Sequence, residues 1–282
     1  MDKSVRSISF FLFNLFFYIF FLLSCSKKWD TLNYITYISG KLFIINPEGL
    51  EISGQIGKLN FPSKITTGEN SFGVVSITFP NYGYCRISIY PNSFVEIRRT
   101  YKEPKGMIHV EISNIFGIAL LKSDKCVFSY ASAEIKDSFV RIIGDLSNNH
   151  LEVIEGSIKI GRKTIQAGSG MKISGKLEQY SLNQAVESVL PVQGRFPKPL
   201  VFMWKRADGG TRYFLEISEQ RNFDTVSLIL ETNSNTFFPE QITIKSTSDF
   251  YFWRVWYRDK EGRGSFFSTP VSFTVRTQRV IK

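Results

Sequence analysis

Short runs of alternating apolar and polar residues dominate the chain from Tyr34 onward. These runs are rich in Ile, Val, Phe, Tyr and Thr, and Gly, Asn, Pro or Asp residues separate them, which is the pattern of β-strands joined by turns. No amphipathic helix of useful length interrupts the series. Parallel sheets need helical crossover segments between their strands, so the absence of such helices argues against parallel sheets. The sequence therefore predicts an all-β fold whose sheets are mostly antiparallel.

The predicted strands form two sets. The first set comprises residues 35–39, 42–45, 74–79, 86–90, 94–98, 107–112, 116–121, 127–130, 138–143, 151–154, 157–160 and 171–174. A tight turn is expected at Glu155-Gly156, between the strands at 151–154 and 157–160, because Gly tolerates a positive φ. The second set comprises residues 201–204, 212–218, 225–230, 250–258 and 271–276, which is the size of one immunoglobulin-like sandwich.

Between the two sets the alternation stops, and Gly and Pro residues accumulate from Gly175 to Pro199. This stretch contains a weakly helical run at 182–189. We interpret it as a linker. The predicted organisation is a β domain at 34–178, a linker at 179–199 and a β-sandwich at 200–277.

The N-terminus has a basic head with Lys3 and Arg6, followed by an apolar stretch that ends in Leu22-Leu23-Ser24-Cys25. This arrangement resembles a bacterial lipoprotein signal peptide, and in that family the Cys becomes the lipidated first residue of the mature chain. The alternative is an uncleaved membrane-spanning helix, which needs roughly 20 apolar residues. The run 8–23 is shorter and contains Asn14. We therefore expect a leader at 1–24 and lipidation at Cys25.

Residues 25–33 are then a tether, and the protein is expected in the cell envelope, anchored to a membrane by its N-terminal lipid and facing the periplasm or the cell surface. The chain has 35 Lys and Arg residues against 25 Asp and Glu residues, a net charge of +10. Such an excess favours acidic partners such as anionic lipid head groups, lipopolysaccharide or nucleic acid. Export argues against nucleic acid. The alternative is that the excess positive charge is spread diffusely over the surface and binds no particular partner, because the sequence contains no run of like charges.

Apart from Cys25, the chain has only Cys85 and Cys126. Both residues alternate with apolar neighbours and are expected to point into an apolar interior. A disulfide between them suits an oxidising envelope. Two buried free thiols that merely pack are the alternative. Neither Cys has a third Cys or a His nearby, so no metal or nucleophilic chemistry is predicted.

The first β set carries five short motifs in a specific order. They are Ile38-Ser39-Gly40-Lys41-Leu42, Ile65-Thr66-Thr67-Gly68, Ile89-Tyr90-Pro91-Asn92-Ser93, Val153-Ile154-Glu155-Gly156-Ser157-Ile158 and Ala167-Gly168-Ser169-Gly170-Met171. In their order and spacing they resemble the FecR domain family over about residues 34–174. The chain departs from that family at Lys136-Asp137-Ser138, where Arg-Gly-Thr is usual. The loss of this Gly calls the local turn geometry into question.

FecR family members that regulate sigma factors carry a cytoplasmic anti-sigma segment ahead of a membrane helix. Neither part is recognised in this sequence, so the resemblance implies an envelope β module rather than a transcriptional role. The second β set resembles a fibronectin type III-like sandwich, on the strength of residues 202–204, 213–218, 222–223 and 251–255. This resemblance places Trp204 and Trp253 in the core. It says little about function, because sandwiches serve many binding and spacer roles.

Catalysis needs a convergent set of titratable groups. The chain has two His residues, of which His109 lies inside a predicted strand and His150 follows a turn sequence, where solvent exposure is expected. Carboxylates occur in two loose pairs whose odd spacing places the members on opposite strand faces. The pairs are Glu134 with Asp137 and Glu152 with Glu155. We therefore predict no catalytic residue, no metal site and no cofactor.

The segment 250–258 carries the most informative surface pattern. Tyr251, Trp253, Val255 and Tyr257 share one face of the predicted strand, and Phe250 begins the other face. The rest of that other face is a stripe of Phe252, Arg254, Trp256 and Arg258. Large aromatics with Arg dominate protein interfaces and also stack on sugars. The stripe is therefore either a binding face for an envelope protein or polysaccharide, or the seat of a contact with the first domain or the linker.

Together these observations predict a lipid-anchored, non-enzymatic envelope protein that serves binding or assembly. A FecR-like signalling module is the first alternative, and a partner gene for a sigma factor would favour it. A carbohydrate-active envelope enzyme is the second, and a deep pocket with two carboxylates would favour it.

Overall fold

The computed structural model describes residues 32–46, 48–79, 83–103, 106–145, 148–191, 195–196, 201–237 and 250–275. The predicted leader, Cys25 and most of the tether lie outside these residues. The described part belongs to one compact unit that begins at Leu32. It consists of strands and contains no helix, which confirms the all-β prediction. Accordingly, the described residues include no helix long and apolar enough to cross a membrane.

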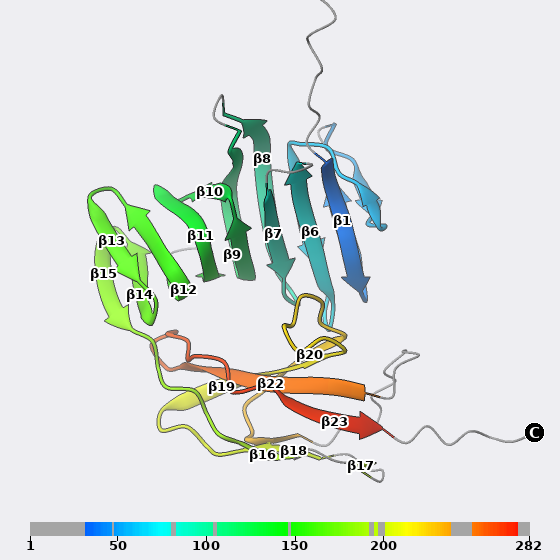
Figure 1. Ribbon diagram of the computed structural model, residues 1–282, viewed down its shortest axis with the longest axis vertical. Coiled ribbons are helices and arrows are strands. Elements are labelled where there is room, and N and C mark those ends of the chain that lie inside the picture. Colours follow the sequence, from blue (N-terminus) through cyan, green and yellow to red (C-terminus); the bar gives the residue numbers. More distant parts are fainter. Residues whose placement is uncertain are drawn as a thin grey trace, which may run out of the picture. The chain divides into compact units, whose positions relative to one another are not determined.

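A fifteen-stranded, mostly antiparallel sheet contains the first part of the chain, and Figure 1 shows several of its strands side by side. The strands in chain order are β1 (Leu32–Ser39), β2 (Leu42–Ile45), β3 (Glu51–Ser53), β4 (Gly57–Lys58), β5 (Ser63–Thr67), β6 (Phe72–Phe79), β7 (Gly83–Ile89), β8 (Phe94–Lys102), β9 (Ile108–Asp124), β10 (Cys126–Tyr130), β11 (Ala133–Gly144), β12 (Asn149–Ile160), β13 (Lys163–Gln166), β14 (Ser169–Ser174) and β15 (Lys176–Ser181). One edge of the longest path is β15, and the other is β4 next to β1.

Strand β9 turns the sheet around its core. Its first half pairs with β8 and β10, and its second half pairs with β7 and β11. Gly117 lies between the halves at a φ of 79°, and a Cβ there would lie 2.2 Å from the Ser93 Oγ. The two strands predicted at 107–112 and 116–121 are thus one bent strand. Side chains from β1, β6 and β7 meet side chains from β2, β5 and β8 in a single apolar cluster inside the bend.

The turn expected at Glu155-Gly156 is also wrong, because both residues lie inside β12. The first half of β12 pairs with β14 and the second half pairs with β13, so the strand continues while its partner changes. Gly156 has a φ of 77° at the place where the register with β11 shifts, and a Cβ there would lie 2.8 Å from the Asp137 carbonyl oxygen. The Gly therefore permits a bulge and not a turn.

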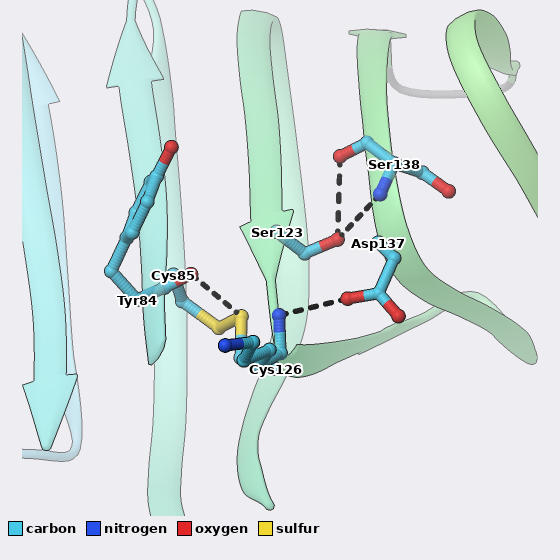
Figure 2. Close-up of a disulfide and its surroundings, with 7 residues drawn as sticks. Tyr84, Cys85, Ser123, Cys126, Asp137 and Ser138 are labelled. Carbon is cyan, nitrogen blue, oxygen red and sulfur yellow. Dashed lines mark hydrogen bonds between the residues drawn. A yellow bond between two sulfur atoms is a disulfide. The ribbon is translucent and has the colours of Figure 1, made fainter. Parts of the chain in front are cut away.

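A disulfide joins Cys85 on β7 to Cys126 on β10, with a Cα–Cα distance of 5.9 Å (Figure 2). Both residues are fully buried in the core cluster. Of the two alternatives that the sequence leaves open, the structure contains the bonded one. The bond ties two strands that are not hydrogen-bonded neighbours in the sheet order, because β9 lies between them.

Asp137 occupies the position at which the resemblance to the FecR family implies a Gly. It adopts a φ of 46°, and its Oδ1 accepts a hydrogen bond of 2.8 Å from the Lys125 backbone N–H. Figure 2 shows this carboxylate beside the disulfide, with Ser138 bonded to Ser123. Asp is one of the residues that tolerate the left-handed conformation, because its side chain can hydrogen-bond locally. The loss of Gly therefore does not remove the positive φ.

The second part of the chain forms two further sheets. A three-stranded sheet contains β16 (Ser188–Leu190), β18 (Phe202–Trp204) and β21 (Thr236–Phe237), and a five-stranded sheet contains β17 (Arg195–Phe196), β19 (Gly210–Ser218), β20 (Leu228–Thr232), β22 (Phe250–Asp259) and β23 (Val271–Val275). Side chains from both sheets meet in one aromatic core. Trp204 and Trp253 are fully buried there, as the resemblance implied. The arrangement is sandwich-like.

Strands occupy parts of the predicted linker, and its helical run at 182–189 is wrong, because these residues contain no helix. β15 still pairs with β14 up to Ser181, and β16 begins at Ser188. The side chains of β15 are mostly exposed on both faces, so the strand shows no alternation in the sequence and depends on its backbone pairing. Residues 182–187 connect the two parts. The predicted domain boundaries stay a prediction.

Candidate functional site

The outer face of the first sheet carries apolar residues on β6, on β9 and on β11, and β7 lies between β6 and β9. Along β9, Leu121 points into the core of the first sheet, whereas Leu120 packs outward. The same alternation separates Ile142 from Ile143 on β11. The outward residues join residues of the second part in one buried cluster, which we call the junction: Phe72, Val74, Tyr90, Ile118, Leu120, Ile143, Phe214, Phe223, Val226, Ile229 and Trp256.

The predicted stripe on β22 lies in the junction. Trp256 is fully buried, and its ring stacks on that of Phe214 at a centroid distance of 4.1 Å and meets that of Tyr90 edge-on at 6.2 Å. Arg254 is buried as well, while Phe252 and Arg258 are partly exposed. The phase of the strand is as predicted. Of the two alternatives for the stripe, the structure contains the intrachain contact, because the outer face of the first sheet covers the centre of the stripe.

An ion pair between Glu216 and Arg254 lies inside the junction. The two residues stand directly opposite each other on β19 and β22, and the Arg254 Nε donates to the Glu216 Oε2 at 2.7 Å. The Trp256 Nε1 donates to the other carboxylate oxygen at 3.1 Å, and the Tyr90 hydroxyl donates to it as well. Burial, and next the charge of Glu216, raise the pKa of Tyr90 well above its ordinary value. The Tyr therefore remains a donor to the carboxylate.

A second buried ion pair joins Arg141 on β11 to Glu152, its direct neighbour on β12, with 2.6 Å between the Arg Nε and the Glu Oε2. Both side chains are fully buried. The loop after β22 completes their coordination: the Arg141 Nη2 donates to the Ser265 carbonyl at 2.7 Å, and the Gly264 N–H donates to the Glu152 Oε1 at 2.5 Å. A Cβ at Gly264 would lie 2.1 Å from the Arg141 Nη2, so this position requires Gly.

His150 and Tyr180 extend the second pair. The Tyr180 hydroxyl lies 3.0 Å from the His150 Nδ1 and donates to the Glu152 Oε1 at 3.0 Å. The prediction of a solvated His150 is wrong, because it lies on β12 and is buried under the loop at Gly262. Burial lowers its pKa although the charge of Glu152 opposes this effect. The imidazole is therefore neutral near neutral pH.

Aromatic rings connect the two ion pairs. The Arg141 guanidinium lies 4.0 Å from the centre of the Trp256 ring, and the Arg254 guanidinium lies 3.8 Å from that of Phe267 and 4.1 Å from that of Phe223. Each of the two guanidinium groups thus has a carboxylate partner and an aromatic ring partner inside the junction. This arrangement joins the two parts of the chain and keeps the charged groups away from solvent.

A cleft of about 260 Å³ opens beside the junction. One wall is a cross-strand row of Arg86, Lys122, Phe139 and Glu155 on β7, β9, β11 and β12. The other lining residues are Ser88, Leu120, Arg221, Asn222, Phe223 and Arg254. The cleft therefore presents four cationic side chains and one carboxylate around a partly aromatic surface.

Asp224 lies next to this cleft and partly neutralises it. Its Oδ1 forms an ion pair with Arg86 and lies 3.7 Å from the Lys122 Nζ. Burial alone raises the pKa of Asp224, but the hydrogen bond and charge of Arg86 outweigh it and hold the pKa below its ordinary value. Within the described chain no ion pair to Arg221 is observed. Arg221 is thus the cation of the cleft that is best placed to bind an anion.

The other predicted site residues are dispersed. His109 lies on β9, with its Nε2 2.9 Å from the Glu103 Oε1. The carboxylates of Glu134 and Asp137 face different surroundings, since Asp137 binds the Lys125 backbone. No group of three or more His, Cys, Asp and Glu residues in the described ranges is arranged to hold a metal ion.

Sequence reasoning missed Arg141 and Glu216, the centres of the two ion pairs. A signal for both exists in the chain. Each is a charged residue in the middle of an apolar strand, and Arg141 has Phe139 and Ile143 two positions away on the same face. An apolar outer face around a charge indicates that something covers that face.

Comparison with known proteins finds no matching family model and no matching curated protein. The resemblance to the FecR family therefore depends on the quoted motifs alone.

Proposed function

We propose that this chain is a lipid-anchored, non-enzymatic envelope protein in which a FecR-like β domain and a fibronectin type III-like sandwich together bind an acidic polysaccharide. The observation that carries the proposal is the cationic cleft beside the junction, to which both parts of the chain contribute. The lipid anchor is proposed from the sequence around Cys25.

The composition of the cleft supports an acidic sugar. Arg86, Lys122 and Arg254 have carboxylate partners, whereas Arg221 has none among the described residues. Arg221 therefore offers a guanidinium fork suited to a carboxylate. The half-buried ring of Phe139 offers apolar surface for the face of a sugar ring. A volume of about 260 Å³ suits one residue of a polymer rather than a large ligand.

The junction supports a binding module rather than an enzyme. Its titratable groups lie close together, but they are paired with each other inside a buried cluster. The pairs are Arg141 with Glu152 and Arg254 with Glu216. Such an arrangement stabilises the relative placement of the residues that line the cleft. A rigid cleft binds with a smaller loss of conformational entropy.

Replacing Arg221 with Glu is expected to weaken binding to immobilised polygalacturonate at least roughly tenfold, since losing a hydrogen bond to a charged group costs about 1.5–3 kcal/mol. The measurement is a biosensor titration at two salt concentrations, with neutral dextran as a reference surface. Arg212→Glu is the matched control, because this substitution changes the net charge of the protein by the same amount. Arg212 is exposed on β19, where it pairs with Glu231.

Binding that exceeds the dextran reference and falls for Arg221→Glu but not for Arg212→Glu supports the cleft. Equal losses in the two variants would show that the overall charge of the protein attracts the polymer, and the cleft would be rejected. Equal binding to dextran and polygalacturonate would reject the acidic ligand.

Replacing Cys25 with Ala is expected to abolish incorporation of radiolabelled fatty acid and to leave the leader uncleaved. The measurement is metabolic labelling followed by mass spectrometry of the membrane fraction. Cys85→Ser, made together with Cys126→Ser, is the control, because these Cys residues form the disulfide and should not affect labelling. An intact N-terminus near Met1 in the wild-type membrane protein would contradict the anchor.

A further inference from the structure

Exposed aliphatic side chains gather where the described chain begins. Ten large hydrophobic residues are exposed in the described part, and five of them lie between residues 32 and 56. Three have the largest exposures in this group: Leu50 at 63%, Ile52 at 48% and Ile56 at 68%. The other two are Leu32 and Tyr34 on β1. Single exposed hydrophobic residues are common, but a local group of five requires an explanation.

Backbone pairing places Ile56 next to the strand that carries Leu32 and Tyr34, and Leu50 and Ile52 lie a few residues before Ile56 along the chain. β4 pairs with β1, with Tyr34 opposite Lys58, and Ile56 directly precedes β4. β3, which carries Ile52, is followed by Ile56 four residues later. Leu50 and Ile52 point to the same side because they are two residues apart along an extended chain, and Glu51 points to the other. We call Leu32, Tyr34, Leu50, Ile52 and Ile56 the aliphatic patch.

The predicted lipid anchor lies close to this patch along the chain. Only seven residue steps separate Cys25 from Leu32, which a fully extended chain spans in roughly 25 Å. The connecting sequence, Ser26-Lys27-Lys28-Trp29-Asp30-Thr31, contains two Lys residues and a Trp. Lys residues attract anionic lipid head groups, and Trp prefers the membrane interface.

We propose that the aliphatic patch inserts into the phospholipid surface that holds the N-terminal lipid, so that the edge of the first sheet at β1 and β4 faces the membrane. This inference rests on the lipid anchor of the proposed function. The patch would add to the attachment made by the lipid at Cys25, through apolar side chains that would otherwise stay in water.

The test uses the full mature lipoprotein in phosphatidylethanolamine and phosphatidylglycerol vesicles. Ile52→Cys and Ile56→Cys each introduce a single reactive thiol, since the disulfide occupies Cys85 and Cys126 and the proposed lipid occupies Cys25. The thiol is labelled with an environment-sensitive fluorophore, and a nitroxide-bearing phospholipid is added as quencher. Leu177→Cys is the matched control: Leu177 is 43% exposed but lies on β15, at the opposite edge of the sheet order.

We expect roughly threefold or stronger quenching at positions 52 and 56 than at 177, because interfacial side chains lie about 5–10 Å into the head-group boundary. Adding Ile52→Asp to the variant labelled at position 56 should reduce its quenching toward the control value.

Equal quenching at all three positions would overturn the inference. Fluorescence that changes with protein concentration but not with the quencher would overturn it too, and would indicate that a second copy of the chain covers the patch. Flotation of the vesicles separates these results from failure of the anchor, since a protein that does not float refutes the lipid at Cys25 itself.

Discussion

Replacing Glu216 with Ala is expected to lower the free energy of unfolding by about 3–5 kcal/mol, the cost of removing one partner of a buried ion pair. The substitution leaves the Arg254 guanidinium, which donates to the carboxylate at 2.7 Å, without its anion in a buried site. It also removes the acceptor of the Tyr90 hydroxyl and of the Trp256 indole N–H. The measurement is urea unfolding followed by Trp fluorescence with linear extrapolation.

Glu231→Ala is the matched control for this result. Glu231 on β20 forms an ion pair of 2.9 Å with Arg212 on β19, so this pair has the same residue types as Glu216 and Arg254. Both of its side chains, however, are largely exposed. An exposed pair contributes about 0–1 kcal/mol. If Glu216→Ala and Glu231→Ala lowered stability equally, the carboxylate of Glu216 would have to be solvated, and the junction as described would be wrong.

Replacing Trp256 with Ala is expected to lower the free energy of unfolding by about 3–5 kcal/mol as well, through lost apolar contact and the cavity left behind. The indole fills the space between Phe214, Tyr90 and the Arg141 guanidinium, and those groups come from both parts of the chain. Neighbouring strands cannot close this space without moving the two parts relative to each other. The measurement is again urea unfolding, here followed by circular dichroism because a Trp is removed.

Phe250→Ala is the control, because Phe250 begins the same strand and is an exposed aromatic. A surface substitution of this kind changes stability by about 0.5 kcal/mol or less. Limited proteolysis adds a readout of the junction: in Trp256→Ala, cleavage in the connection 182–187 should become faster than in the wild type. A Trp256→Ala protein as stable and as resistant as Phe250→Ala would show that the junction does not hold the two parts together.

Most strands were predictable because each is long enough to show a period of two. The predicted segments in the first set fall within strands of the structure to within a residue, and the segments at 250–258 and 212–218 do the same in the second. Strands such as β3, β4 and β21 were missed because two or three residues carry no period. Gly156 was misread for a different reason, since a Gly at positive φ serves a bulge as well as a turn.

The candidate site was predictable only in part. The alternation along β22 correctly assigned Trp253 and Trp256 to opposite faces. It did not say what covers Trp256. The partners of the site lie far away in the sequence: Glu152 binds the Gly264 N–H across 112 residues, and Tyr90 binds Glu216 across 126 residues.

The sequence by itself determined the all-β class, the side of each long strand on which a residue lies, and the position of Cys85 and Cys126 in one interior. These properties follow from local backbone geometry, because the alternation of side chains is a feature of a single strand. Only the tertiary structure decided that the outer face of the first sheet meets the stripe on β22, that Arg141 and Glu216 are buried with partners, and that His150 is covered. Which surfaces meet depends on the summed burial and pairing of groups from distant segments, and no single segment carries that information.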